Sequence, residues 1–123
     1  MQLALSPIKQ SGMILSVEGT TVYFSGCIDT PRPGKFLQPF LAELNREIIN
    51  NDIKAITLDV TQLSYLNSAG IREIVDWIMT LDQLPEHQRF SIHFIYNSKY
   101  VWQESSISTF VFLNADFISK EVV

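Results

Sequence analysis

Four small residues, Asn67-Ser68-Ala69-Gly70, separate two apolar runs of the sequence, and one of them carries a hydroxyl group. An exposed serine can accept a phosphoryl group, which adds about −1.5 to −2 charges. The same residue in the first turn of a helix can instead act as an N-cap, whose oxygen accepts a backbone N–H and contributes about 1 kcal/mol. The residue types therefore indicate either a modification site at Ser68 or a structural cap.

Side chains suited to catalysis or metal binding are few and scattered. His87 falls in a polar segment and His93 in an expected strand, without a second ligand at the spacing of a zinc site. Asp29 and Asp59 can be considered as a pair of acids, but Asp59, near a strand end, is more typical of a turn or solvent-facing residue. Phosphate-binding glycine loops and nucleophile-elbow motifs are absent. We expect a protein that is not an enzyme and uses no metal or cofactor.

Hydrophobic periodicity predicts the elements that would position Ser68. The runs on either side of Glu18-Gly19 predict a hairpin, and a loop rich in proline and glycine follows from about Asp29 to Lys35. The predicted strands are Met13–Val17, Thr21–Phe24, Lys54–Val60, Arg89–Tyr96 and Asp116–Val122, and the predicted helices run from about Leu37 to before Asn50, from about Ala69 to Leu81, and around Ile107–Leu113. This β-β-α-β-α-β-α-β order predicts one α/β domain over residues 1–123, with helices packed against a single mixed sheet.

The predicted topology brings two loops together. Strands joined by single helices usually pair in parallel, and open α/β sheets place their sites at the carboxyl ends of such strands. The loop from Asp29 to Gly34 should therefore lie beside Ser68, with Asp29 capping a backbone amide or ordering the loop. Trp77 falls at the border of the apolar stripe of its helix, so it is either a half-exposed interface anchor or a core residue.

Composition limits the classes of partner and compartment. The chain has 123 residues and a net charge of −4, without the basic surface that nucleic acids require. It has a single cysteine, Cys27, which fits a reducing compartment and is more typical of a small core residue than of a nucleophile. No apolar run approaches the ~20 residues that span a bilayer, and the first residues do not resemble a secretory signal. We expect a cytoplasmic protein that binds neither nucleic acid nor membrane, and its oligomeric state stays open.

Two motifs resemble those of the STAS family, named for sulfate transporters and anti-sigma factor antagonists. DVTQLSY (Asp59–Tyr65) followed by NSAGI (Asn67–Ile71) resembles the family's D-[LV]-[ST]-x-[LV]-x-[FY] connector and its D-S-[ST]-G-[LI] helix start, and SGCID (Ser25–Asp29) resembles its G-x-[LIV]-D element. The resemblance covers about Met13 to Asn114 and looks most like a stand-alone bacterial or cyanobacterial subgroup. Asn67 stands where the family has an aspartate, and Ala69 leaves Ser68 as the only hydroxyl of the turn.

The resemblance implies a phosphorylation-controlled interaction switch. In antagonists of this family the serine that matches Ser68 is phosphorylated by a partner that is both serine kinase and anti-sigma factor, a separate phosphatase removes the phosphate, and only the unmodified form binds the partner. The residues expected to shape this site are Asp29, Asn67, Ala69 and Gly70. The residues expected to contact the partner are Thr30, Ile71, Arg72, Glu73, Asp76 and Trp77. The alternatives are a constitutive scaffold or interaction module and a domain that binds a nucleotide or other small ligand.

Overall fold

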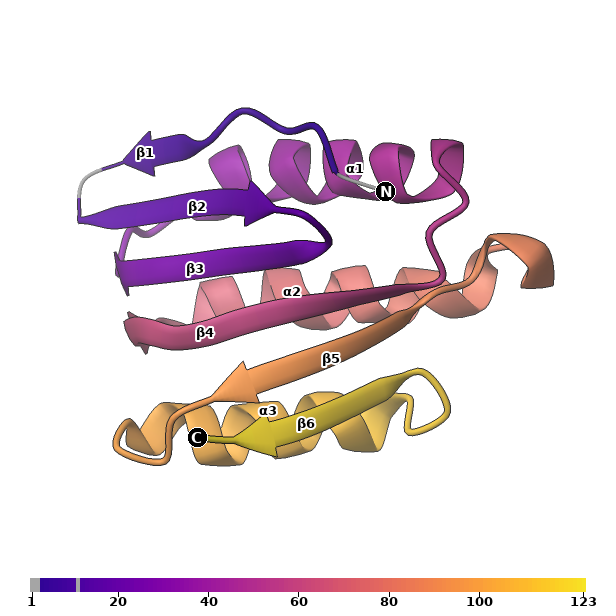
Figure 1. The fold of residues 1–123 in the computed structure, drawn as a ribbon. Helices are drawn as coiled ribbons and strands as arrows, with labels where there is room; N and C mark the ends of the chain where they lie inside the picture. The colour runs from indigo at the N-terminus through magenta and orange to yellow at the C-terminus, as the bar shows by residue number, and fades with distance from the viewer. Residues whose placement is uncertain (1–2, 11) are drawn as a thin grey trace.

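A six-stranded mixed sheet forms the centre of the computed structural model, which describes residues 3–10 and 12–123 (Figure 1). The strands are β1 (Ile8–Gln10), β2 (Met13–Glu18), β3 (Thr21–Ile28), β4 (Ala55–Leu66), β5 (Ser91–Tyr96) and β6 (Ile118–Val122). The helices are α1 (Gly34–Asn50), α2 (Ser68–Thr80) and α3 (Val101–Leu113), and two short 3-10 turns, η1 (Leu81–Gln83) and η2 (Glu86–Gln88), connect α2 to β5. The predicted α/β class is confirmed.

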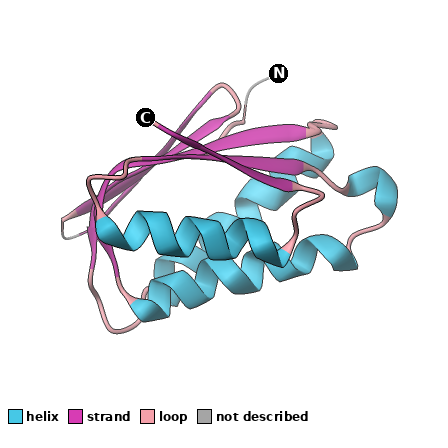
Figure 2. Cartoon of the chain, turned by 90° about the horizontal axis from the view of Figure 1, so that it is seen from below, coloured by secondary structure: helices cyan, strands magenta, loops and turns pink. Residues whose placement is uncertain are grey.

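The strands lie in the sheet in their order along the chain. β1, β2 and β3 are antiparallel neighbours, whereas β3, β4, β5 and β6 are parallel to one another. All three helices cover the same face of the sheet, and the described residues place no helix on the opposite face (Figure 2). The predicted strands and helices are all present, and β6 is an edge strand as expected. The structure adds β1, which escaped prediction because it is three residues long and only Ile8 is partly buried.

Side-chain alternation explains why one face of the sheet is covered. Along β4, Ile56, Leu58 and Val60 are buried against the helices, while Thr57 and Asp59 are half-buried on the opposite face. β5 repeats this pattern with Ile92, Phe94 and Tyr96. α2 contributes Ile74, Trp77 and Ile78, and η1 adds Leu81. Because strand residues alternate between faces, only one face of the sheet is apolar enough to bury a helix layer.

The first two helices begin differently from the prediction. α1 starts at Gly34 instead of Leu37, so Pro39 lies in its second turn, where proline lacks the N–H that would bond to the preceding turn. Pro39 is exposed, and the buried face of α1 is supplied by Leu37, Phe40, Leu41, Leu44 and Ile48. α2 starts at Ser68, one residue earlier than predicted. In the described part of the chain, no helix is long and apolar enough to cross a membrane.

A glycine allows β3 to continue to the sheet edge near Ser68. Gly26 has a φ of +91°, and a Cβ atom there would lie 2.0 Å from the carbonyl oxygen of Gly12. The close approach lets Cys27 donate its N–H to that oxygen at 2.7 Å, beside an irregularity in the β3–β4 register. β3 therefore extends four residues beyond the predicted strand, to Ile28.

Candidate functional site

The predicted meeting of two loops at the carboxyl edge of the sheet is confirmed. Ile28, the last residue of β3, is paired with Leu66, the last residue of β4. The N–H of Asn67 then donates to the carbonyl oxygen of Ile28 at 3.0 Å. This pairing brings the β3–α1 loop, from Asp29 to Pro33, beside the start of α2 and therefore beside Ser68.

Asn67, and not Ser68, caps helix α2. The side-chain oxygen of Asn67 accepts the N–H of Gly70 at 2.8 Å, and its φ and ψ of −71° and 169° are typical of an N-cap residue. Ser68 is the first residue inside the helix and is exposed. No hydrogen bond joins its hydroxyl to the described part of the chain, so the cap expected as the structural alternative for Ser68 is wrong. The hydroxyl is free at the surface.

The amide nitrogen of the same Asn67 side chain fastens the neighbouring loop. Nδ2 of Asn67 donates to the carbonyl oxygen of Thr30 at 2.7 Å. A carboxylate at this position could cap the helix but could not donate this bond. The asparagine that departs from the STAS motif therefore has a structural role, because it ties the start of α2 to the β3–α1 loop.

The two small residues after Ser68 allow close packing at the helix start. A Cβ atom on Gly70 would lie 2.4 Å from Cδ1 of Leu66, a separation that side chains do not tolerate. Gly70 is buried, and Ala69 is half-buried. A larger side chain at position 70 would require the side chain of Leu66, at the end of β4, to move.

β4 is longer than predicted, and two side chains of α3 donate hydrogen bonds to the carbonyl oxygens of its last residues. The segment from Asp59 to Tyr65, expected as a connector, belongs to the strand, whereas pairing with β5 stops at Asp59. Beyond that point Nε2 of Gln103 donates to the carbonyl oxygens of Val60 and Leu63 at 2.7 and 2.8 Å. The side chain of Gln103 is completely buried, and its oxygen accepts the N–H of Asn97 at 2.7 Å.

The indole of Trp102 also donates hydrogen bonds to the end of β4, and we call Trp102 and Gln103 together the α3 clamp. Its Nε1 donates to the carbonyl oxygens of Leu63 and Ser64 at 3.2 and 3.1 Å. Trp102 and Gln103 thus replace the missing strand neighbour along the end of β4, which leads directly into Ser68. Sequence reasoning missed both residues, because Gln103 does not stand out in a helix that also contains Glu104 and several serines.

The residues expected to contact a partner differ in exposure. Arg72 and Asp76 are exposed on α2, as is Thr30 in the β3–α1 loop. Glu73 is half-buried and accepts a hydrogen bond from Nε2 of Gln38 on α1 at 3.1 Å. Ile71 is partly buried and packs against the core. Only part of the expected contact surface is therefore free.

Trp77 is a core residue. Its side chain is 5 % exposed, its ring lies 6.5 Å from that of Phe90 between centroids, and its Nε1 donates to Oδ1 of Asn45 at 2.8 Å. The interpretation of Trp77 as a half-exposed interface anchor is wrong. The reason is that α1 lies against α2 and covers the border of its apolar stripe. The spacing of apolar residues within α2 alone cannot show which other helix packs beside it.

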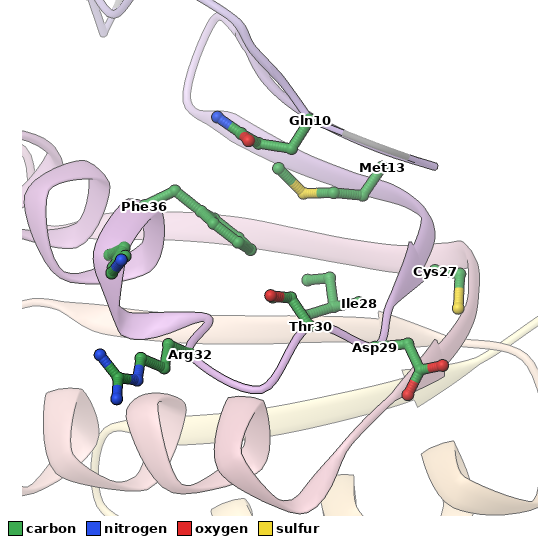
Figure 3. Close-up of a pocket in the computed structure, with 9 residues that line it drawn as sticks. Gln10, Met13, Cys27, Ile28, Asp29, Thr30, Arg32 and Phe36 are labelled. Carbon is green, nitrogen blue, oxygen red and sulfur yellow. The ribbon is translucent and has the colours of Figure 1, made fainter.

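A small cavity opens next to the β3–α1 loop. Its volume is about 210 Å³, and Figure 3 shows Met13, Ile28 and Phe36 around it, with the carboxylate of Asp29 pointing away from them. Ligand pockets usually measure about 300–1,000 Å³, so the cavity is small for a nucleotide. Asp29 is exposed, and no hydrogen bond links its carboxylate to the described residues. The ordering role expected of Asp29 is filled instead by the Asn67–Thr30 hydrogen bond.

The remaining candidate groups have local partners. The imidazole of His93 contacts Ser119 and Glu121 on the face of the sheet without helices, at 2.7 and 2.9 Å. Oδ1 of Asp59 accepts hydrogen bonds from the N–H and hydroxyl of Thr61, at 2.9 and 2.7 Å. Within residues 3–10 and 12–123, no three His, Cys, Asp or Glu side chains are grouped as metal ligands.

Comparison with known proteins supports the fold and not a family. No family model and no curated protein matches the chain. A chain of the crystal structure of diguanylate cyclase SiaD in complex with its activator SiaC from Pseudomonas aeruginosa is similar in fold, with a TM-score of 0.69 and 16% identity over 96% of this chain and 99% of that chain. A structure of SiaC of Pseudomonas aeruginosa gives a TM-score of 0.67 and 16% identity over 97% and 100% of the two chains. The chain has a SiaC-like fold.

Proposed function

We propose that this chain is a protein-interaction switch in which the hydroxyl of Ser68 carries a phosphoryl group in one state. The observation that carries the proposal is that Ser68 is exposed at the start of α2 while Asn67 supplies the cap. Modification of Ser68 therefore removes no hydrogen bond on which the helix depends. The added negative charge also lies at the positive end of the helix dipole, where it is tolerated.

The similarity to SiaC supports an interaction role. SiaC is an activator that forms a complex with a diguanylate cyclase, so this fold can act by binding another protein. In our proposal the unmodified chain binds its partner, and a phosphate on Ser68 releases it. Burial of the phosphate in the interface would remove water from it. If this desolvation reduced the binding free energy by about 3 kcal/mol, the affinity would fall more than a hundredfold.

The finer assignment rests on the resemblance of the Asn67–Ile71 segment to STAS antagonists. We propose that the partner includes a serine kinase of the anti-sigma type, that a phosphatase restores the unmodified form, and that the chain itself performs no catalysis. This assignment also implies a reducing, cytoplasmic environment, in keeping with the single Cys27.

Mass spectrometry of the protein purified from its own cells tests the switch. We expect phosphate on the Ser68 peptide under some growth conditions and none in the Ser68→Ala variant. Ser98→Ala is the matched control, because Ser98 is an exposed hydroxyl in the loop between β5 and α3 at the same edge. Complete coverage of the Ser68 peptide without phosphate under every condition, or phosphate that persists in Ser68→Ala, would contradict the proposal.

Binding measurements test the direction of the switch. A partner should co-purify with Ser68→Ala and much less with Ser68→Glu, although one carboxylate carries less charge than a phosphate. Because Ser68 is not the cap, both variants should unfold within about 0.5 kcal/mol of the wild type. Equal recovery of the partner with both variants would instead support a constitutive interaction module.

A further inference from the structure

The exposed residues of α2 form a single stripe that begins at Ser68. They are Ser68, Arg72, Asp76 and Met79, at spacings of four, four and three residues. These spacings place side chains above one another on one face of a helix. Arg72 therefore lies one turn beyond Ser68 on the solvent side of α2, and it is the only Lys or Arg of this helix.

The guanidinium of Arg72 has no acidic partner within 4 Å in the described part of the chain. Its sequence neighbour Glu73 instead accepts a hydrogen bond from Nε2 of Gln38 on α1 at 3.1 Å. Asp76 follows Arg72 by four residues, which is the less favourable order for an ion pair because the cation precedes the anion. Arg72 can therefore bind a new anion without breaking an existing ion pair.

Helix geometry directs the side chain of Arg72 toward the turn that holds Ser68. Side chains of an α-helix lean toward its N-terminus and lie over the preceding turn, and Cβ atoms four residues apart are separated by about 5–6 Å. An anion followed four residues later by a cation is the favourable order. The planar guanidinium also presents paired N–H donors that match two phosphate oxygens. A phosphoryl group on Ser68 would thus lie within reach of Arg72 with no movement of the backbone.

The other charged side chains near this edge belong to loops or to α1. Arg32 and Lys35 line the small cavity beside the β3–α1 loop, and that loop also carries the exposed Asp29. Nζ of Lys99, in the loop between β5 and α3, lies 5.3 Å from the ring centroid of Tyr100. Arg72 is the cation whose position relative to Ser68 is set by a shared helix.

We infer that Arg72 binds the phosphoryl group of phosphorylated Ser68 in an ion pair within α2. This inference rests on the proposed function and names the residue that holds the phosphate. Phosphorylation would add about −1.5 to −2 charges to the exposed stripe and would at the same time occupy the only cation of that stripe. A partner that pairs an acidic group with Arg72 in the unmodified chain would lose this contact.

The test uses the full chain with phosphoserine incorporated at position 68 during translation, so that no kinase is needed. Phosphorus NMR between about pH 4 and pH 8 gives the second pKa of the phosphate, which is ordinarily about 6. A neighbouring guanidinium favours the dianion and lowers this pKa. We therefore expect Arg72→Gln to raise the pKa of the phosphate by about 0.3 or more.

Arg32→Gln is the matched control, because it removes the same charge from an exposed position in the neighbouring loop. It reproduces the long-range effect of net charge, and we expect it to change the pKa of the phosphate by less than about 0.1. Arg72→Lys keeps the charge at the same position and should retain most of the lowered pKa. Circular dichroism of each variant would establish that it is folded.

Distinct results overturn the inference and the proposed function. Equal phosphate pKa values in the wild type and Arg72→Gln, or an equal rise in Arg32→Gln and Arg72→Gln, would refute the ion pair. Either result would leave Ser68 as the modification site. Absence of phosphate from Ser68 in cells would refute the proposed function, whereas the titration of the phosphoserine chain would still decide whether Arg72 binds the phosphoryl group.

Discussion

The side chain of Asn67 joins two loops at once, because its Nδ2 donates to the carbonyl oxygen of Thr30 at 2.7 Å while its Oδ1 accepts the N–H of Gly70 at 2.8 Å. Among the usual N-cap residues only asparagine has its donor and its acceptor on two different side-chain atoms, because the hydroxyl of serine or threonine is a single oxygen. The start of α2 and the β3–α1 loop are therefore fastened by one residue next to Ser68. Displacement of the loop would therefore also shift the start of α2 beside Ser68.

Substitution of Asn67 should separate its two roles. Asn67→Asp keeps a cap but places a carboxylate against the Thr30 carbonyl oxygen, so we expect faster amide hydrogen exchange in residues 29–34 with α2 still protected. Asn67→Ala removes both bonds and should lower the free energy of unfolding by about 1–2 kcal/mol. Loop exchange that is unchanged in Asn67→Asp would show that the Thr30 bond does not order the loop.

Gln103 should be among the most sensitive polar residues of the chain. Gln103→Leu leaves two carbonyl oxygens of β4 and the N–H of Asn97 without this partner, and we expect a loss of at least about 2 kcal/mol in urea unfolding. Ser105→Ala, at an exposed position of the same helix, is the control and should lie within about 0.5 kcal/mol of the wild type.

Gln103→Glu provides a further test of the hydrogen bonds from Gln103 to β4. An ionised carboxylate would face the carbonyl oxygens of Val60 and Leu63, so the variant should be less stable than Gln103→Leu at neutral pH. Protonation restores one donor, and its deficit relative to the wild type should shrink as the pH falls. A deficit that does not depend on pH would contradict the assigned hydrogen bonds.

Trp77 should affect stability and not the intrinsic affinity for a partner. Truncation to alanine removes a buried indole and leaves Asn45 without its partner, so we expect a loss of about 3–5 kcal/mol and a lower Tm. Asp76→Ala, one residue away and exposed, should leave the Tm nearly unchanged. A Trp77→Phe variant that unfolds like the wild type but fails to bind the partner would overturn this assignment.

Tyr96 gives the fold a dependence on alkaline pH. The carboxylate of Glu104 raises the pKa of the Tyr96 hydroxyl above its usual value, because it favours the protonated hydroxyl as a hydrogen-bond acceptor and repels the tyrosinate. The folded chain therefore holds this proton more tightly than the unfolded chain, so the contribution is complete below about pH 10 and is lost as the pH rises through the folded pKa.

The pH dependence can be measured by urea unfolding between about pH 8 and pH 11, with absorbance at 295 nm reporting tyrosinate. Glu104→Gln removes the negative charge, and we expect its stability to fall less steeply with pH than that of the wild type. Tyr100→Phe, in the neighbouring loop, is the control and should follow the wild-type slope. Identical slopes for the wild type and Glu104→Gln would refute the coupling.

Local periodicity predicted the helices and every strand of the described chain except β1. The alternation of Ile56, Leu58 and Val60 and the helical spacing of Ile74 and Ile78 reflect burial against one layer, which sequence records directly. The full length of β4 was not predictable, because its last residues depend on hydrogen bonds from Gln103 and Trp102, about forty residues away along the chain. β1 was missed because a three-residue edge strand leaves almost no pattern.

The candidate site was predictable in position and not in detail. Parallel strands implied that the Asp29 loop would meet Ser68, and the Asn67–Thr30 contact confirms it. Whether Asn67 or Ser68 is the cap depends on whether α2 begins at residue 68 or 69. A sequence pattern does not define the first residue of a helix that precisely. The burial of Trp77 depends on α1, which lies against α2 in space but precedes it by a whole strand in the sequence.

The pairing of Cys27 with Tyr65 across β3 and β4 has a practical consequence. Adjacent strands are about 4.8 Å apart, so the only thiol of the chain lies one strand away from the exposed side chain of Tyr65, three residues before Ser68. An environment-sensitive dye attached to this half-buried sulfur would lie near the carboxyl edge of the sheet, and its emission should change when a bound molecule covers that edge. The native chain thus provides its own fluorescent reporter position, with no engineered cysteine, for following association and release in real time.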